Sequence, residues 1–338
     1  MLKIELSMPE ELSEEKLEQL IDLNIGFYDE LHPEDPPRSR ELIRDFLLNP
    51  HPLWNFCRWF VIDTNKDRIV GASVISYENQ KSPQYDVKRN IADIFAIVGR
   101  DYRGQGLGSR LLDLIIAEAK KLKRRQLQGE CSLEFSRTFL LKHGAIITSE
   151  RKTQRLYLKD IDPNTLKDWR QNGAVLNPGV KLHTLRVIHE DILKGYVNLY
   201  NETVQQTPEF DSGDAMPVLT SAEDRRETEK LVSEKNITWI TIISEQASGQ
   251  LSGFTEIFQR AAEPFVVEQG MTGVLKEHRK RGLGKWLKAE AVDYITKNLK
   301  RAGCIETGNA NANSAMISIN KRLGFQDYLP HAIFSLKI

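Results

Sequence analysis

The chain has 338 residues, and its 47 Lys and Arg residues balance 47 Asp and Glu residues. At roughly 100–200 residues per domain, this length predicts about two domains, and the charge balance argues against a protein that binds nucleic acid through bulk positive charge. The sequence has no apolar run of about 18 residues and no basic, then apolar, N-terminal segment, so we expect neither a membrane span nor a signal peptide.

The first half begins with a short strand and an amphipathic helix. Apolar residues at 2–6 predict the strand, and Ser13 is the expected cap of a helix with apolar residues at helical spacing from Leu17 to Ile25. A proline-rich loop follows at 32–37, because proline ends helices and fixes turns. The next elements are two strands and a glycine-rich turn, at 59–62, 69–76 and 103–108. A helix, a strand, a second helix and a final strand complete the half.

The second half repeats this order. The pattern V-x4-R-x-x-G-x-G begins at Val98 and again at Val274. Strands are predicted at 180–187, 238–243 and 251–258, with a helix starting near Glu190. The repeat indicates a tandem duplication of one mixed α/β unit. We expect one domain at 1–160, a linker rich in turn signals at 161–179, and a second domain at 180–338.

The glycine-rich turns predict an anion site. Glycine lets the backbone turn tightly, and the helix that follows offers unpaired N–H groups to a phosphate or pyrophosphate. A Walker loop does not fit, because Gly284-Lys285 is followed by Trp286 rather than Ser or Thr. A dinucleotide-binding turn does not fit either, since Ser109 stands at its third glycine position.

These residues resemble a known family. Arg103-Gly104-Gln105-Gly106-Leu107-Gly108 resembles the pyrophosphate loop, Q/R-x-x-G-x-G/A, of the GNAT acetyltransferase superfamily, and Arg279 to Gly284 matches its spacing. In the second half, Thr307-Gly308-Asn309 and Leu323-Gly324-Phe325 resemble one branch of that family more closely. The resemblance implies an α/β fold with a mixed sheet in two tandem GNAT acyltransferase domains, an arrangement similar to that of mycothiol synthase.

The resemblance also implies that acetyl-coenzyme A binds at each loop. Backbone amides of the loop are expected to hold the pyrophosphate, and the strand before it to accompany the pantetheine arm. The implied cofactor-binding residues of the first half are Ile97, Val98, Arg103, Gly104, Gln105, Gly106, Leu107, Gly108 and Ser109. Those of the second half are Gly273, Val274, Leu275, Arg279, Lys280, Arg281, Gly282, Leu283, Gly284, Lys285 and Asn313.

The catalytic residues are also implied by the resemblance. In the histone-acetylating branch, a Glu eleven positions before the loop is the general base, and that position is Glu268 here. The competing interpretation of Glu268 is a solvated carboxylate at a strand end. The same count gives Ala92 in the first half, with Asp93 on the opposite strand face. The usual acid, a Tyr, is replaced by Asn320 and, in the first half, by Leu140, so a Tyr-type mechanism is not supported.

Polar residues of the last helix favour the second half as the catalytic one. Asn320 can hydrogen-bond to the cofactor but cannot supply a proton. Asn313 is expected to cap this helix, and the cap is compatible with a contact to the cofactor. The first half has Leu133 and Leu140 at these two positions, so we expect it to bind the cofactor without turnover or to have a structural role.

We therefore expect an acyltransferase, specifically an acetyl-coenzyme A-dependent N-acetyltransferase that acts on a small amine by direct transfer. The alternatives are a non-catalytic acyl-coenzyme A binding or sensing protein and a nucleotide-binding regulator. The acceptor is expected to meet the loops at 30–51 and 205–222. Within the second loop, the acidic stretch at 210–214 either attracts a cationic amine or is an ordinary surface loop.

The remaining reactive side chains predict no further chemistry. The cysteines are odd in number and scattered, at Cys57, Cys131 and Cys304, which argues against a disulfide framework and a thiolate metal site. The histidines considered as ligands lack metal-binding spacing, at His183, His189 and His278, so we expect no metal ion. We expect a cytoplasmic protein that binds neither nucleic acid nor membrane, either as a monomeric pseudo-dimer or as a homodimer.

Overall fold

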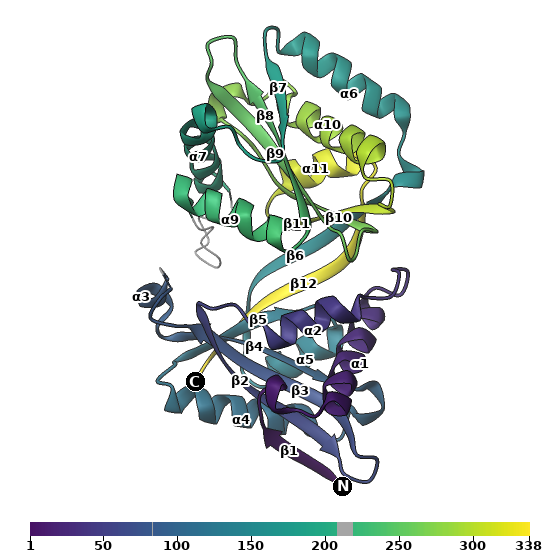
Figure 1. The fold of residues 1–338 in the computed structure, drawn as a ribbon, viewed down its shortest axis with the longest axis vertical. Helices are drawn as coiled ribbons and strands as arrows, with labels where there is room; N and C mark the ends of the chain where they lie inside the picture. The colour runs from purple at the N-terminus through teal and green to yellow at the C-terminus, as the bar shows by residue number, and fades with distance from the viewer. Residues whose placement is uncertain (83, 208–218) are drawn as a thin grey trace. The chain divides into compact units, whose positions relative to one another are not determined.

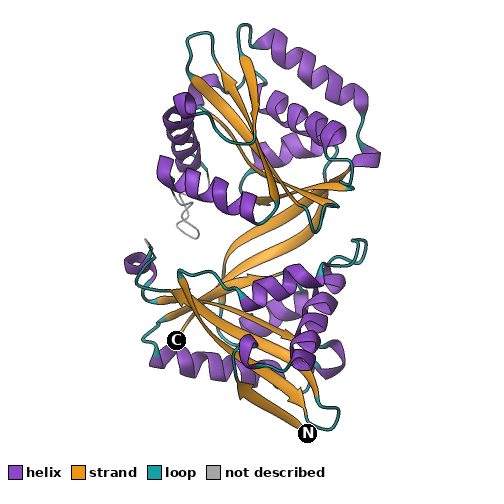
Figure 2. Cartoon of the chain, in the orientation of Figure 1, coloured by secondary structure: helices purple, strands orange, loops and turns teal. Residues whose placement is uncertain are grey.

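A computed structural model describes residues 1–82, 84–207 and 219–338, which form two compact units (Figure 1). Unit 1 consists of Met1–Glu150 and His331–Ile338, and unit 2 consists of Arg151–Pro330. Each unit contains a mixed sheet with helices on both faces (Figure 2). The predicted α/β class, present twice, is confirmed.

Unit 1 has the strand order β1-β2-β3-β4-β5-β12. Its neighbouring strands are antiparallel apart from β4 and β5, which are parallel. The strands are β1 (Leu2–Leu6), β2 (Trp54–Asp63), β3 (Arg68–Glu78), β4 (Ile91–Val98), β5 (Gln126–Cys131) and the end of β12 (Gln326–Lys337). The helices are α1 (Glu14–Leu31), α2 (Arg40–Leu48), α3 (Tyr85–Lys88), α4 (Leu107–Lys121) and α5 (Glu134–Lys142).

Helices cover both faces of this sheet. Ser13 caps α1 as predicted, accepting a hydrogen bond from the backbone N–H of Lys16 at 3.3 Å. Helices α1 and α2 pack on one face, where Ile21 is buried with Phe60 of β2. Helices α4 and α5 pack on the other, where Leu111 is buried with Ala92 of β4. We call these the α1 face and the α4 face.

Unit 2 has the strand order β6-β11-β10-β9-β8-β7, with β10 and β11 parallel. The strands are β6 (Ile146–Tyr157), β7 (Lys181–Leu185), β8 (Ile237–Glu245), β9 (Leu251–Arg260), β10 (Val266–Val274) and β11 (Cys304–Ala310). The helices are α6 (Pro163–Leu176), α7 (Glu190–Gln205), α9 (Ala222–Glu234), α10 (Leu283–Asn298) and α11 (Ser314–Leu323). Helices α7 and α9 cover one face, the α7 face, and α6, α10 and α11 cover the α10 face.

The last strand of each sheet comes from the other half of the chain. In unit 1, Ala332 to Lys337 of β12 pair with β5, and in unit 2, Arg151 to Tyr157 of β6 pair with β11. The units therefore divide the chain differently from the domains expected at 1–160 and 180–338. The segment 161–179, expected as a linker, contains α6, which is joined to α10 by an ion pair of 2.9 Å between Arg170 and Glu290. Turn signals show where a chain bends, but they do not select the strand with which the next segment pairs.

Candidate functional site

Two parallel strands separate at the centre of each sheet. In unit 1, β4 and β5 pair only from Ile91 to Asp93 of β4 within the described chain. In unit 2, β10 and β11 pair only from Val266 to Glu268 of β10 across the same described ranges. In each sheet, we use the word fork for the point at which the two parallel strands stop pairing. Beyond it, the next residues of β4 and β10 form a sheet edge, and an extended ligand can add to such an edge through main-chain hydrogen bonds.

The glycine-rich turns follow these two strands and lead into α4 and α10. Gly104, Gly106 and Gly282 have φ of 74°, 75° and 75°, and Lys280 has φ of 63°. These left-handed conformations favour glycine. A Cβ added at Gly104 or Gly106 would meet no other described atom within 4 Å. The first turn therefore leaves open space beside the start of α4, whereas an added Cβ at Gly282 would touch Leu176 at 3.6 Å.

Neither of the two helices has a side-chain cap among the described residues. Their N-cap residues are Gly106 and Gly282, whereas α1 and α11 are capped by Ser13 and Asn313. The first-turn N–H groups of an α-helix have no partner within the helix, and together with the helix dipole they favour an anion. A pyrophosphate fits these two helix starts.

The predicted loop arginines hydrogen-bond to the ends of β4 and β10, the strands that precede the glycine-rich turns. The Nε atoms of Arg103 and Arg279 donate to the carbonyls of Val98 and Val274, both at 2.9 Å. Arg103 also makes a bidentate ion pair with Glu30 of α1, at 2.8 and 2.7 Å. This hydrogen bonding lowers the pKa of Glu30. We conclude that these arginines position the loop.

Several other predicted loop residues bury their side chains. Leu107 and Leu283 are each 1% exposed, and Ile97 and Leu275 are also in the core. Such residues can offer a ligand only their backbone groups. Ser109 is different, because its hydroxyl lies 3.2 Å from Nε2 of His143. His143, the C-cap residue of α5, was not among the predicted site residues.

Each unit has one acidic residue at its fork on β4 or β10. The strand register shows which residue of β4 corresponds to Glu268 of β10. On β10, Gln269 faces Ile257 and Thr272 faces Thr255, so β10 has one extra residue, a β-bulge. By contrast, β3 and β4 pair without interruption up to Asp93. Glu268 and Asp93 both occupy the last parallel pair before the fork. The expectation that Ala92 matches Glu268 is wrong, because counting back from the loop ignores the bulge.

The two acids have different surroundings. The side chain of Glu268 is 46% exposed and ion-paired with Arg260 of β9. Asp93 is partly buried and accepts a hydrogen bond from Nε2 of Gln128 at 2.9 Å. Burial raises the pKa of Asp93, and the Gln128 hydrogen bond opposes the shift. A carboxyl with a raised pKa is better suited to accept a proton near neutral pH.

Unit 2 carries three asparagines on β11 and at α11, one of the helices of the α10 face. Asn313 caps α11, as predicted, by accepting from the backbone N–H of Met316 at 3.3 Å. Asn320 is fully buried and donates to Oε1 of Gln154 at 2.9 Å. Oδ1 of Asn320 and Nδ2 of Asn309 are buried without a partner among the described residues. One acceptor and one donor left unpaired fit an amide-containing ligand, such as a pantetheine arm.

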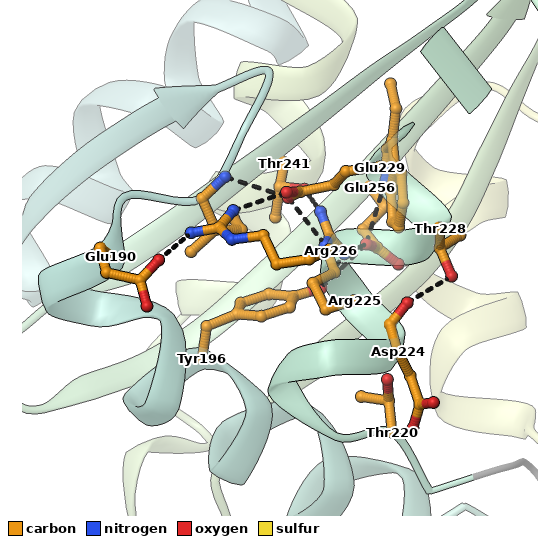
Figure 3. Close-up of polar contacts among 12 residues, drawn as sticks. Glu190, Tyr196, Thr220, Asp224, Arg225, Arg226, Thr228, Glu229, Thr241 and Glu256 are labelled. Carbon is orange, nitrogen blue, oxygen red and sulfur yellow. Dashed lines mark hydrogen bonds and ion pairs between the residues drawn. The ribbon is translucent and has the colours of Figure 1, made fainter. Parts of the chain in front are cut away.

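A buried polar cluster fills the α7 face of unit 2 next to the bulge (Figure 3). The guanidinium of Arg225, which is 4% exposed, donates to Tyr196 at 2.9 Å and to Glu256 at 2.8 Å. It also donates to Glu229 at 3.0 Å and to Thr241 at 2.9 Å. Burial, with the charge of Glu256, raises the pKa of Tyr196 well above its usual value. Tyr196 therefore remains a hydrogen-bond donor, and the cluster occupies the face with its own side chains.

Three further expectations concerned an acidic acceptor loop, metal ions and membrane spans. The acidic stretch at 210–214 lies outside the described residues. Within the described ranges, no group of three or more His, Cys, Asp or Glu side chains is arranged to hold a metal ion. No helix in those ranges combines the length and apolar character needed to cross a bilayer.

Comparisons with known proteins agree with this geometry. Residues 17–144 and 197–325 match the model of the Acetyltransferase (GNAT) family. A tandem GNAT protein from the clavulanic acid biosynthesis pathway is 21% identical, with a TM-score of 0.76, over 100% of this chain and 98% of that one. A GCN5-related N-acetyltransferase from Sphaerobacter thermophilus is 13% identical, with a TM-score of 0.66, over 99% of this chain and 95% of that one. No curated protein matches the sequence.

Proposed function

Because the chain belongs to the Acetyltransferase (GNAT) family and carries its domain in each half, we propose that it transfers an acetyl group from acetyl-coenzyme A to a small primary amine. The observation that carries the proposal is the helix start without a side-chain cap that follows a left-handed glycine, found in both units. In each unit this turn follows a strand with a free edge beyond the fork.

Coenzyme A would lie along the loop and the fork. The first-turn amides of α4 and α10 would hold its pyrophosphate, with Gly104 and Gly106 leaving room for it in unit 1. In unit 2, Asn309 and Asn320 would pair with an amide of the pantetheine arm. When bound, the co-substrate supplies a thioester carbonyl that an amine can attack and a thiolate that can leave.

The chain's main chemical task is to remove a proton from the amine. A carboxylate at the fork, Asp93 in unit 1 or Glu268 in unit 2, would take one proton from the ammonium group. The neutral amine then forms the N–C bond while the C–S bond breaks, and the nitrogen of the new amide loses its second proton to solvent. Asn320 and Leu140 stand where an acid would be needed, so the leaving thiolate takes its proton from solvent.

A second function, acyl-coenzyme A binding without turnover, is favoured for unit 2 by the Arg225 cluster. That cluster fills the face from which an amine would approach the bulge of β10. Under this proposal unit 2 holds the co-substrate, and transfer takes place at Asp93. The unit expected from sequence to be catalytic, which contains Glu268, is then the binding unit.

The proposal is tested by coenzyme A release with a panel of primary amines, together with calorimetric titration of acetyl-coenzyme A. We expect Asp93→Asn to lower kcat by roughly a hundredfold or more, because positioned proton transfer contributes about 10²–10⁴-fold. Glu268→Gln is the matched variant for unit 2. Titration with unchanged affinity would show that the variants remain folded. Tight binding of acetyl-coenzyme A by the wild type without coenzyme A release for any amine would support the binding protein instead.

A further inference from the structure

The α1 face of unit 1 brings a carboxylate and two aromatic rings together at the fork. Asp93 and Phe95 are two residues apart on β4 and so point to the same face. The neighbour Ala92 points the other way, into the core beneath α4. Phe95 meets Phe27 of α1 edge to face, with ring centroids 5.8 Å apart. All three side chains therefore lie on the α1 face.

Asp93 has no cation paired with it in the described chain. Its hydrogen-bond partner is the neutral amide of Gln128. The nearby cation, Lys88, lies 3.6 Å from the carboxylate of Glu78, which is itself buried. A partly buried carboxylate without a paired cation is destabilised by desolvation, and an ammonium group bound beside it would stabilise its charged form.

The ring next to Asp93 is open to solvent. Phe95 is 44% exposed, although it lies in the middle of a central strand. Residues two apart on a strand are roughly 7 Å from each other. A ligand that places its amine at Asp93 and stacks a ring on Phe95 therefore needs only a short alkyl linker. Aromatic pairs of this kind contribute about 0.5–1.5 kcal/mol beyond the area they bury.

The same face of unit 2 is occupied by the protein. Counted back from the loop arginine, Met271 of β10 matches Phe95 of β4, and Met271 packs into the core under α7. Thr203 of α7 lies so close to Gly273 that an added Cβ would be 2.7 Å from its Oγ1. The Arg225 cluster covers Glu256 beside the bulge. The protein's own side chains therefore fill the α7 face of unit 2 near the fork, whereas Phe95 on the α1 face of unit 1 is exposed.

We infer that unit 1 binds an arylalkylamine as its acceptor, with the ammonium group on Asp93 and the aromatic ring on Phe95 and Phe27. The inference rests on the proposed function and adds the chemical class of the amine. It also predicts that unit 2 does not bind this acceptor.

The test compares 2-phenylethylamine with butylamine, which has the same amine but no ring. Both are assayed for coenzyme A release, and both are titrated calorimetrically into the protein saturated with coenzyme A. We expect Phe95→Ala to raise KM and Kd for 2-phenylethylamine about tenfold and to raise those for butylamine much less, because butylamine forms no ring pair. Phe95→Leu keeps apolar volume and should lose most of the ring preference. Leu141→Ala, an exposed apolar residue of α5, is the matched control and should behave as the wild type.

The outcomes separate this inference from the proposed function. Equal KM and Kd for the two amines, or an equal effect of Phe95→Ala on both, would overturn the acceptor class while leaving acetyl transfer intact. If no amine releases coenzyme A, acetyl transfer fails. The calorimetric titration then still tests the acceptor class. Tighter binding of 2-phenylethylamine than of butylamine, lost in Phe95→Ala, would support the inference, and absence of amine binding would reject it.

Discussion

The amine of Lys288 is buried in the core of unit 2, on α10, and is 1% exposed. At the matching place in its own core, α4 carries Leu112. Nζ of Lys288 donates to Oε1 of Gln269 at 2.8 Å and lies 5.4 Å from the ring centroid of Phe325. Burial lowers the pKa of Lys288 to about 7. A hydrogen bond to a neutral amide does not compensate for burying a positive charge.

This lysine makes the stability of unit 2 depend on pH. Its pKa is about 7 in the folded chain and roughly 10.4 when exposed, so the unfolded chain binds more protons between these values. The free energy of unfolding should therefore rise with pH across this window, by up to about 1.4 kcal/mol per pH unit, and stay lowest below pH 7. Lys288→Met should remove the slope and stabilise unit 2 at neutral pH. Urea unfolding at several pH values measures both effects. If the free energy of unfolding changed with pH equally in the wild type and in Lys288→Met, Lys288 would not be the source of the pH dependence.

At the scale of the element, the glycine turn and the helix it opens act together. Gly106, the N-cap residue of α4, has φ of 75°. Asn tolerates this left-handed conformation better than most residues and carries no charge. Asp has nearly the same shape but adds a negative charge next to the proposed pyrophosphate.

We therefore predict that Gly106→Asp weakens acetyl-coenzyme A binding by at least about tenfold relative to Gly106→Asn, because charge-assisted hydrogen bonds worth about 1.5–3 kcal/mol are lost. The same pair of substitutions at Gly282 tests unit 2. Calorimetric stoichiometry distinguishes two sites from one in the wild type. Equal affinities for the Asp and Asn variants at either position would remove that loop from the binding site.

At the scale of the whole molecule, each unit depends on a strand from the other half of the chain. Phe334 and Leu336 of β12 are 3% and 5% exposed in the core of unit 1. An added Cβ at Gly129 of β5 would be 2.9 Å from the ring of Phe334, so this glycine is required for the fit. Unit 1 is therefore incomplete without the last eight residues of the sequence.

Deletion of residues 331–338 should consequently unfold or strongly destabilise unit 1, because it exposes the edge of β5 and removes core side chains. Phe334→Ala should lower the free energy of unfolding of unit 1 by about 3–5 kcal/mol. Hydrogen exchange in β4 and β5 measures this loss, with exposed Lys337→Ala as the control. Unchanged protection of β5 after the deletion would show that unit 1 folds without β12.

The sequence alone determined what depends on near neighbours and on repetition. It predicted two α/β units, the caps Ser13 and Asn313, and the glycine turns, because spacing, capping and left-handed backbone are properties of a few adjacent residues. Tertiary structure decided which strand completes each sheet and which acid stands at each fork. A single bulge in β10 moves the match of Glu268 from Ala92 to Asp93. Strand partners, a bulge and the burial of Arg225 or Lys288 arise from contacts between distant segments, and no local pattern records those contacts.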